Sequence, residues 1–243
     1  MCTWPTGRVF KSAKRLLILL LGSLVAFFVI EAAESQKPDP KVQSAIAAHQ
    51  RRGEECFKAG QFKESVAEFD RMIALRSAIG PHHWQRGISL YYAGDFAGGR
   101  KQFESHRAVN PNDVENAVWH FLCVARASGL AQARQNLIPI AGDGRIPMMK
   151  IHALFAGKAK PEDVLTETKL GNPSENELKQ REFYAHLYLG LYYEALKDST
   201  KVTNHIFKAE TLAPVAGYMG DVARVHANLL RHPPTGNAQS ATH

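Results

Sequence analysis

Between residues 45 and 231 the hydrophobic and polar positions follow a helical pattern. Phe62, Val66, Phe69 and Ile73 succeed one another at steps of four, three and four residues, which places them on one face of an amphipathic helix. A second stretch, with its apolar residues Phe96, Phe103 and Val109, continues this pattern. No segment reads as a strand, so the pattern predicts an all-α body.

The first two helical stretches repeat each other at a distance of 34 residues. The matching positions are Arg52-Gly53 with Arg86-Gly87, Ala59-Gly60 with Ala93-Gly94, Phe62 with Phe96, and Phe69 with Phe103. This period is the length of the tetratricopeptide helix-turn-helix unit. Gly53 and Gly87 stand where two helices must pack closely. Gly60 and Gly94 stand where the first helix must end, because glycine accepts positive φ.

A further unit lies near the C-terminus, where Pro214 follows Gly190 at the same interval of 24 residues that separates Pro111 from Gly87. Residues 141–180 are irregular, with short helices expected at 148–155 and 161–168. The sequence therefore predicts a right-handed, TPR-like solenoid over residues 45–231. Its parts are repeats at 46–77 and 81–111, a degenerate pair at 114–140, a repeat at 182–214, a capping helix at 219–230 and a flexible tail at 232–243.

The N-terminus has the pattern of an export signal. Basic residues precede an apolar run from Leu16 to Ile30, which is shorter than the roughly 18–20 residues of a comfortable membrane span. Small residues before a cut after Ser35 favour a cleaved signal peptide over residues 1–35, and an uncleaved signal anchor is the alternative. Residues 36–44 are expected to form a linker, because Pro38 and Pro40 oppose helix. Either state predicts an exported protein, periplasmic, secreted or membrane-anchored.

Charge and candidate chemistry narrow the function classes. The formal net charge is +7, and part of it belongs to the N-terminal segment, so nucleic acid is not an expected partner. Cys56 and Cys123 are expected to be buried inert thiols, although a disulfide between them stays open. No H-E-x-x-H or paired acid/base arrangement is present. We therefore expect no catalytic, metal or cofactor site.

Several segments carry a resemblance to one protein group. These are RGISLYYAGDF at 86–96, NPND at 110–113 and FYAHLYLGLYYEALKD at 183–198, and together they resemble the NlpI-type bacterial envelope lipoproteins. The resemblance implies a non-catalytic envelope adaptor that docks proteases and peptidoglycan hydrolases, often as a homodimer. The chain departs from that group in lacking a lipobox cysteine after Ile30, so the N-terminal segment would supply the membrane association.

The resemblance also implies a partner-binding groove, because the first helix of each tetratricopeptide pair lines the concave side. Carried over by position relative to Gly87 and Gly190, the groove residues are Trp84, Ile88, Tyr91, Tyr92, Tyr184, Leu187 and Leu191. Aromatic side chains of this kind suit an apolar or tyrosine-contacting peptide. The alternative is that these side chains only pack between repeats. For the whole chain, the alternative function is an assembly factor for an envelope or pilus-like complex, and an enzyme using Cys56 or Cys123 is the third hypothesis.

Overall fold

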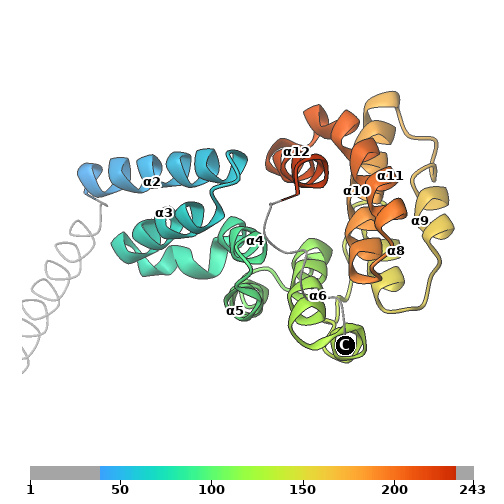
Figure 1. The fold of residues 1–243 in the computed structure, drawn as a ribbon, viewed down its shortest axis with the longest axis horizontal. Coiled ribbons are helices and arrows are strands. Elements are labelled where there is room, and N and C mark those ends of the chain that lie inside the picture. The colour runs from blue at the N-terminus through green and yellow to red at the C-terminus, as the bar shows by residue number, and fades with distance from the viewer. Residues whose placement is uncertain (1–38, 234–243) are drawn as a thin grey trace, which may run out of the picture. The chain divides into compact units, whose positions relative to one another are not determined.

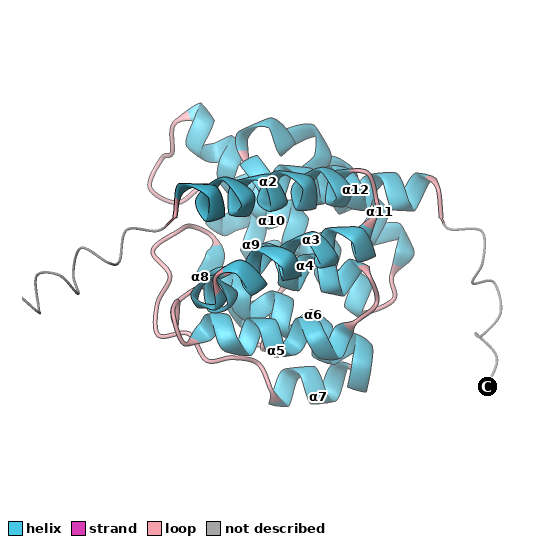
Figure 2. Cartoon of the chain, turned by 90° about the vertical axis from the view of Figure 1, so that its left-hand side faces the viewer, coloured by secondary structure: helices cyan, strands magenta, loops and turns pink. Residues whose placement is uncertain are grey.

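A computed structural model describes residues 39–233 of the 243-residue chain. The chain divides into two compact units, residues 1–44 and 45–243, and only the stretch 39–44 of the first unit is described. Every regular element between residues 39 and 233 is a helix, and this part of the chain contains no strand (Figures 1 and 2). The predicted all-α class is therefore confirmed for the described residues.

Two helical hairpins open the described chain. They consist of α2 (Pro40–Lys58) with α3 (Phe62–Leu75), and α4 (Trp84–Tyr92) with α5 (Phe96–Arg107), joined by the 3₁₀ helix η1 (Ser77–His82). The first helix of each hairpin ends just before a glycine at positive φ, Gly60 at +75° and Gly94 at +81°. Both glycines therefore do what the sequence predicts, which is to let the chain reverse after a helix.

The middle of the chain contains four helices. They are α6 (Val114–Ser128), α7 (Leu130–Gln135), α8 (Met148–Phe155) and α9 (Pro161–Glu167). The two short helices expected at 148–155 and 161–168 are thus present. Helix α6 packs against both α5 and α8, and ten of its residues are buried, so it forms the centre of the core.

The last hairpin pairs two long helices, and one more helix follows it. These elements are α10 (Glu175–Ala195), α11 (Ser199–Leu212), the 3₁₀ helix η2 (Ala213–Val215) and α12 (Gly217–Arg231). Helix α10 begins seven residues before the expected repeat boundary at 182. Its start is fixed by a capping box, in which Ser174 and Glu177 satisfy each other's backbone N–H groups.

Glycine holds the two helices of each hairpin close together. A Cβ atom on Gly87 would lie 2.6 Å from Cζ of Phe103, and one on Gly53 would meet the ring of Phe69. In the last hairpin, a Cβ on Gly190 would lie 2.6 Å from Cδ1 of Ile206. The first helix of each hairpin therefore needs a residue without a side chain at this position, as the repeat pattern predicts.

Helix α12 packs against α11, as expected of a terminal helix, and it also contacts the first two hairpins. The ring of Tyr218 stacks on Phe57 of α2 at 5.4 Å between centroids and meets Trp84 of α4 edge-on at 5.2 Å. Nδ1 of His226 and the hydroxyl of Tyr92 share a hydrogen bond of 2.9 Å. In Figure 1, α12 accordingly lies between α2 and α10. It therefore contacts two of the predicted groove residues, Trp84 and Tyr92.

Of the residues covered by the predictions for the N-terminus, the structure describes only 39–44. Helix α2 begins at Pro40, so the described part of the expected linker 36–44 is helical instead. Proline is tolerated here because the first turn of a helix needs no backbone N–H from it. The expected signal or anchor segment, residues 1–35, lies outside the described residues, and so does the tail from residue 234. Within residues 39–233, no helix combines the length and apolar character required to cross a bilayer.

Candidate functional site

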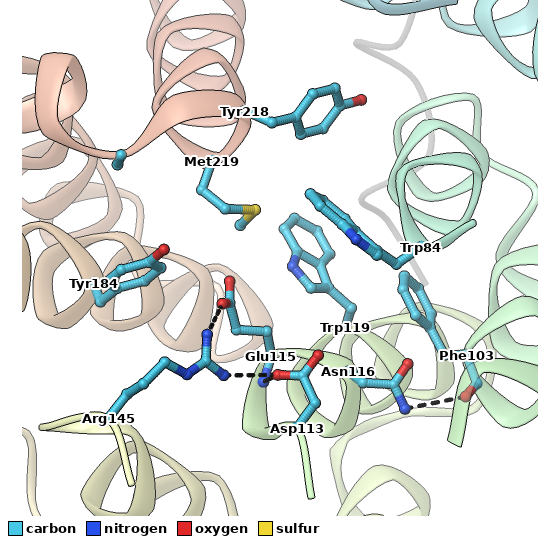
Figure 3. A pocket seen from close by; sticks show the side chains of 11 residues that line it. Trp84, Phe103, Asp113, Glu115, Asn116, Trp119, Arg145, Tyr184, Tyr218 and Met219 are labelled. Atoms are coloured by element: carbon cyan, nitrogen blue, oxygen red, sulfur yellow. Dashed lines mark hydrogen bonds and ion pairs between the residues drawn. The ribbon is translucent and has the colours of Figure 1, made fainter. Parts of the chain in front are cut away.

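Aromatic and charged side chains together line a cavity of about 310 Å³ (Figure 3). We call it the aromatic pocket. Helices α4, α5, α6, α10 and α12 and the loop before α8 contribute to it. Its apolar wall consists of Trp84, Phe103, Trp119, Tyr184, Ala216, Tyr218 and Met219, and its polar wall of Asp113, Glu115, Asn116 and Arg145.

Arg145 is held at the polar wall by three carboxylates. Its Nη1 donates to Glu115 Oε1 at 2.5 Å, and its Nη2 donates to Asp113 Oδ1 at 2.8 Å and to Asp143 Oδ2 at 2.6 Å. Its Nε also donates to Asp143 Oδ1, at 3.0 Å. The guanidinium is therefore occupied by the protein's own carboxylates on every nitrogen.

The start of α6 positions two of these carboxylates. Asp113 is the N-cap residue and accepts from the Glu115 backbone N–H at 3.1 Å, while Asp143 accepts from the Val114 N–H at 3.3 Å. The second oxygen of Glu115 accepts from the Tyr188 hydroxyl at 2.6 Å. Because an N-cap aspartate is fixed by the orphan amides of the helix, the loop that carries Arg145 is tied to a defined point on α6.

Burial and the neighbouring charges shift the pKa values of these groups in different directions. Burial would raise the pKa of Asp143, but the hydrogen bonds from Arg145 outweigh it and lower that pKa. The pKa of Arg145 is raised by the hydrogen bond to Asp143 and by the charge of Glu115, despite its partial burial. Desolvation raises the pKa of Glu115, and burial together with the Glu115 charge raises the pKa of Tyr184 to about 12.

Three buried polar atoms on side chains that line the pocket have no hydrogen-bond partner. They are Oδ1 of Asn116 and Nε1 of Trp119, whose residues are 3% and 1% exposed, and the hydroxyl of Tyr218, which points away from Met219 and Tyr184 in Figure 3. The amide of Asn116 is oriented by its other end, since Nδ2 donates to the Phe103 carbonyl at 3.1 Å. Figure 3 shows the Trp119 nitrogen turned toward the side on which Glu115 and Tyr184 lie. A buried acceptor and a buried donor are thus left for something else to satisfy.

The structure brings only two of the seven predicted groove residues to the pocket. Trp84 and Tyr184, from helices about 100 residues apart in sequence, both line it and both keep part of their surface exposed. The other predicted residues lie in the core or are packed against it. Ile88, Tyr91, Leu187 and Leu191 are at most 4% exposed.

Tyr92 and Tyr91, two of the predicted groove residues, make contacts within the chain itself. The ring of Tyr92 packs against Phe57, Phe62 and Trp119, and its hydroxyl is bonded to His226 of α12. Tyr91 packs on Trp119 and donates to Glu194 at 3.1 Å, and it borders a second, wider hollow of about 770 Å³ together with Arg126. Ile88, Tyr91, Leu187 and Leu191 are thus buried among the helices, whereas Trp84, Tyr92 and Tyr184 are partly exposed and packed against the core.

Sequence reasoning did not find most of the pocket. Trp119 and Asn116 read as part of an apolar helix, and Arg145 follows the Gly142-Asp143-Gly144 stretch, which reads only as a loop. The one usable signal was Asp113, since an aspartate before an apolar helical run predicts an N-cap.

Of the two cysteines in the described chain, Cys123 is buried as expected, whereas Cys56 is only partly buried, contrary to the prediction. Both are free, and Cys123 is fully buried, where desolvation raises its pKa to about 12. Burial and the neighbouring Glu68 also raise the pKa of Cys56. A raised pKa disfavours the thiolate, which is the reactive form. Across residues 39–233, no three His, Cys, Asp or Glu side chains are grouped so as to hold a metal ion.

Comparison with known protein families assigns the chain to none of them, because no family model matches it. The resemblance to tetratricopeptide proteins of the NlpI type therefore stays a prediction.

Proposed function

We propose that this chain is a non-catalytic, TPR-like adaptor of the bacterial cell envelope that binds a protein partner. The observation that carries the proposal is the aromatic pocket, at which Trp84 and Tyr184 present partly exposed rings beside the unpaired buried polar atoms of Asn116 and Trp119. Tryptophan and tyrosine dominate binding energy at protein interfaces, because they offer a large rigid area with a polar tip.

The hairpins support the repeat part of the proposal. The turn after the first helix has the same hydrogen bond in all three, from Gln61 N to Cys56 O at 2.9 Å, from Asp95 N to Leu90 O at 3.0 Å, and from Asp198 N to Tyr193 O at 3.0 Å. The donors of the first two turns are 34 residues apart. Together with the three close glycine contacts, this equivalence is what a tetratricopeptide-type array requires.

The N-terminal segment supports the envelope location. Its basic residues and short apolar run have the pattern of an export signal or anchor, which would place the body in the periplasm or on the outer side of a membrane. By the resemblance to NlpI-type adaptors, the partner is an envelope protease or a peptidoglycan hydrolase, and the adaptor acts as a monomer or a homodimer without a cofactor.

Site-directed cross-linking in the native host tests the proposal. A photoreactive phenylalanine derivative replaces Trp84 in the full chain, and Lys101, an exposed residue of α5 outside the pocket, carries the same probe as the matched control. We expect one or a few envelope proteins to be trapped at position 84 and not at position 101. Traps that appear equally at both positions, or none at position 84, would refute the adaptor role. A trapped partner that copurifies at fixed stoichiometry with membrane subunits would favour the assembly-factor alternative.

A further inference from the structure

The unpaired atoms of Asn116 and Trp119 indicate which polar groups a ligand of the aromatic pocket would need. Asn116 and Trp119 lie one helical turn apart on α6, so their side chains share a face of that helix. Asn116 offers an acceptor and Trp119 offers a donor, and burial keeps both from bulk water. A ligand that fits must therefore bring a donor and an acceptor within one helical turn of each other, as a side chain and its own peptide unit can.

The charged residues of the pocket favour a ligand that carries a positive charge. Three carboxylates, those of Asp113, Glu115 and Asp143, surround the single guanidinium of Arg145. The nearest additional basic group to Asp113 is His106, whose Nε2 lies 3.9 Å from Asp113 Oδ2. Because every nitrogen of Arg145 already faces a carboxylate, the pocket has no free cation for an anionic ligand. The excess of negative charge favours a cation instead.

The aromatic wall favours the same choice. Figure 3 shows Trp84 and Trp119 on one side of the hollow and Tyr184 on the other, with Glu115 and Arg145 below them. The faces of tryptophan and tyrosine attract a cation, and the apolar stem of a lysine or arginine packs well on such rings. A volume of about 310 Å³ suits one long side chain, since it is at the lower end of ligand pockets.

We propose that the aromatic pocket binds one basic side chain, arginine or lysine, of a polypeptide partner. The cationic group lies between the aromatic rings and donates to Asn116 Oδ1 and to the carboxylates, while a main-chain carbonyl of the same segment accepts from Trp119 Nε1. This inference rests on the proposed function in one respect, that the partner is a polypeptide.

Indole N–H signals of the ¹⁵N-labelled full chain test the inference directly. The chain has three tryptophans, so the spectrum has three such signals, which Trp84→Phe and Trp4→Phe variants assign. The probes are capped pentapeptides with the sequence Gly-Gly-X-Gly-Gly, in which X is arginine, lysine, citrulline or glutamate. Citrulline has the shape of arginine without its charge.

We expect the arginine and lysine peptides to shift the Trp119 and Trp84 signals saturably. The citrulline peptide should bind about tenfold more weakly, because it lacks the charge–carboxylate and cation–π attraction. The glutamate peptide should not bind measurably. Equal affinity of the citrulline and arginine peptides, tighter binding of the glutamate peptide, or no shift with any peptide would overturn the inference.

A matched pair of variants distinguishes the effect of pocket charge on peptide binding from the effect of losing a charged helix cap. Asp113→Asn removes one carboxylate charge but keeps an N-cap acceptor on α6, and Asp95→Asn makes the same change at the N-cap of α5, outside the pocket. We expect the affinity for the arginine peptide to fall about fivefold in Asp113→Asn and to stay unchanged in Asp95→Asn. Equal affinities in the two variants would contradict the proposed charge selection. Urea unfolding of both variants verifies that each is folded.

The two proposals fail in different ways. If position 84 traps a partner in the envelope but no basic peptide shifts the Trp119 signal, the adaptor role stands and the ligand class is wrong. If the basic peptide binds saturably but nothing is trapped, the chemistry of the pocket stands and the adaptor role is wrong.

Discussion

The closest helix contact in the second hairpin gives a prediction of definite size, for the substitution Gly87→Val. A Cβ atom at this position would lie 2.6 Å from Cζ of Phe103, about 1 Å closer than the 3.5–4.0 Å of an ordinary carbon contact. Phe103 is 1% exposed, so its ring has no solvent to move into. Overpacking of this kind costs about 1–3 kcal/mol, and the better helix propensity of valine recovers only about 0.4 kcal/mol. We expect a net loss of about 2 kcal/mol of unfolding free energy.

Urea unfolding of the full chain, followed by circular dichroism at the helical band, measures this loss. The mechanism is tested by the double variant Gly87→Val/Phe103→Ala, in which the valine fills part of the space that the ring leaves. We expect the double variant to be more stable than the sum of the single effects predicts, by at least about 1 kcal/mol. Gly94→Ala is the control. Its Cβ would meet nothing, so only its positive φ costs stability, about 1 kcal/mol, and its effect should add to that of Phe103→Ala. A Gly87→Val protein as stable as the wild type, or strict additivity with Phe103→Ala, would refute the close-packing argument.

Three further predictions follow from single contacts. Lys197 has a φ of +61° at the turn position that glycine occupies in the first two hairpins. Lys197→Gly should therefore raise the free energy of unfolding, measured in urea, by about 0.5–1 kcal/mol. A lower free energy of unfolding in this variant would contradict the argument. Burial lowers the pKa of His83 to about 4. As the pH falls from about 6.5 to 4, this histidine is protonated in the unfolded chain but not in the folded chain, so the free energy of unfolding decreases across that window. His83→Asn keeps an acceptor for the Arg86 N–H and should remove about 2 kcal/mol of that decrease, measured by unfolding at pH 7 and pH 4.5; an unchanged pH dependence would count against it. Trp84→Ala should weaken partner binding by about 2 kcal/mol and leave the helix content unchanged. Tyr92→Ala should lower the unfolding temperature, because the Tyr92 hydroxyl bonds to α12 and its ring packs on Phe57. Loss of stability in Trp84→Ala together with loss of binding alone in Tyr92→Ala would disprove both assignments.

The hairpins could be predicted from the sequence because their determinants are local. Gly60 and Gly94 mark the ends of first helices, and Gly53 and Gly87 face a phenylalanine 16 residues later in the same hairpin. The start of α10 also has a local signal, the S-x-x-E capping box that begins at Ser174. Features of this kind depend on residues within one hairpin, so they can be predicted without knowing how the hairpins are arranged.

The pocket could not be predicted because its walls come from five helices and a loop. Periodicity places an aromatic side chain on a helix face, but it does not say whether another element covers that face. Tyr91 and Trp84 both stand on α4, yet Tyr91 is 4% exposed because α6 covers it, while Trp84 remains partly open. Likewise, nothing in the loop sequence indicates that Arg145 reaches three carboxylates, two of which are at the start of α6.

The position of α12 determines what kind of recognition the remaining surface supports. A tetratricopeptide groove usually presents a long concave face, but here Tyr218 stacks on Phe57 and meets Trp84 edge-on, and His226 takes the hydroxyl of Tyr92. Helix α12 thus contacts side chains of α2 and α4 that a groove of the proposed type would expose. What stays open is a pocket with an acidic wall, into which one side chain can enter from a partner lying outside. Specificity would then come from the charge and shape of that single residue, because a charge difference such as that between arginine and citrulline has a larger effect beside partly buried carboxylates than in bulk water.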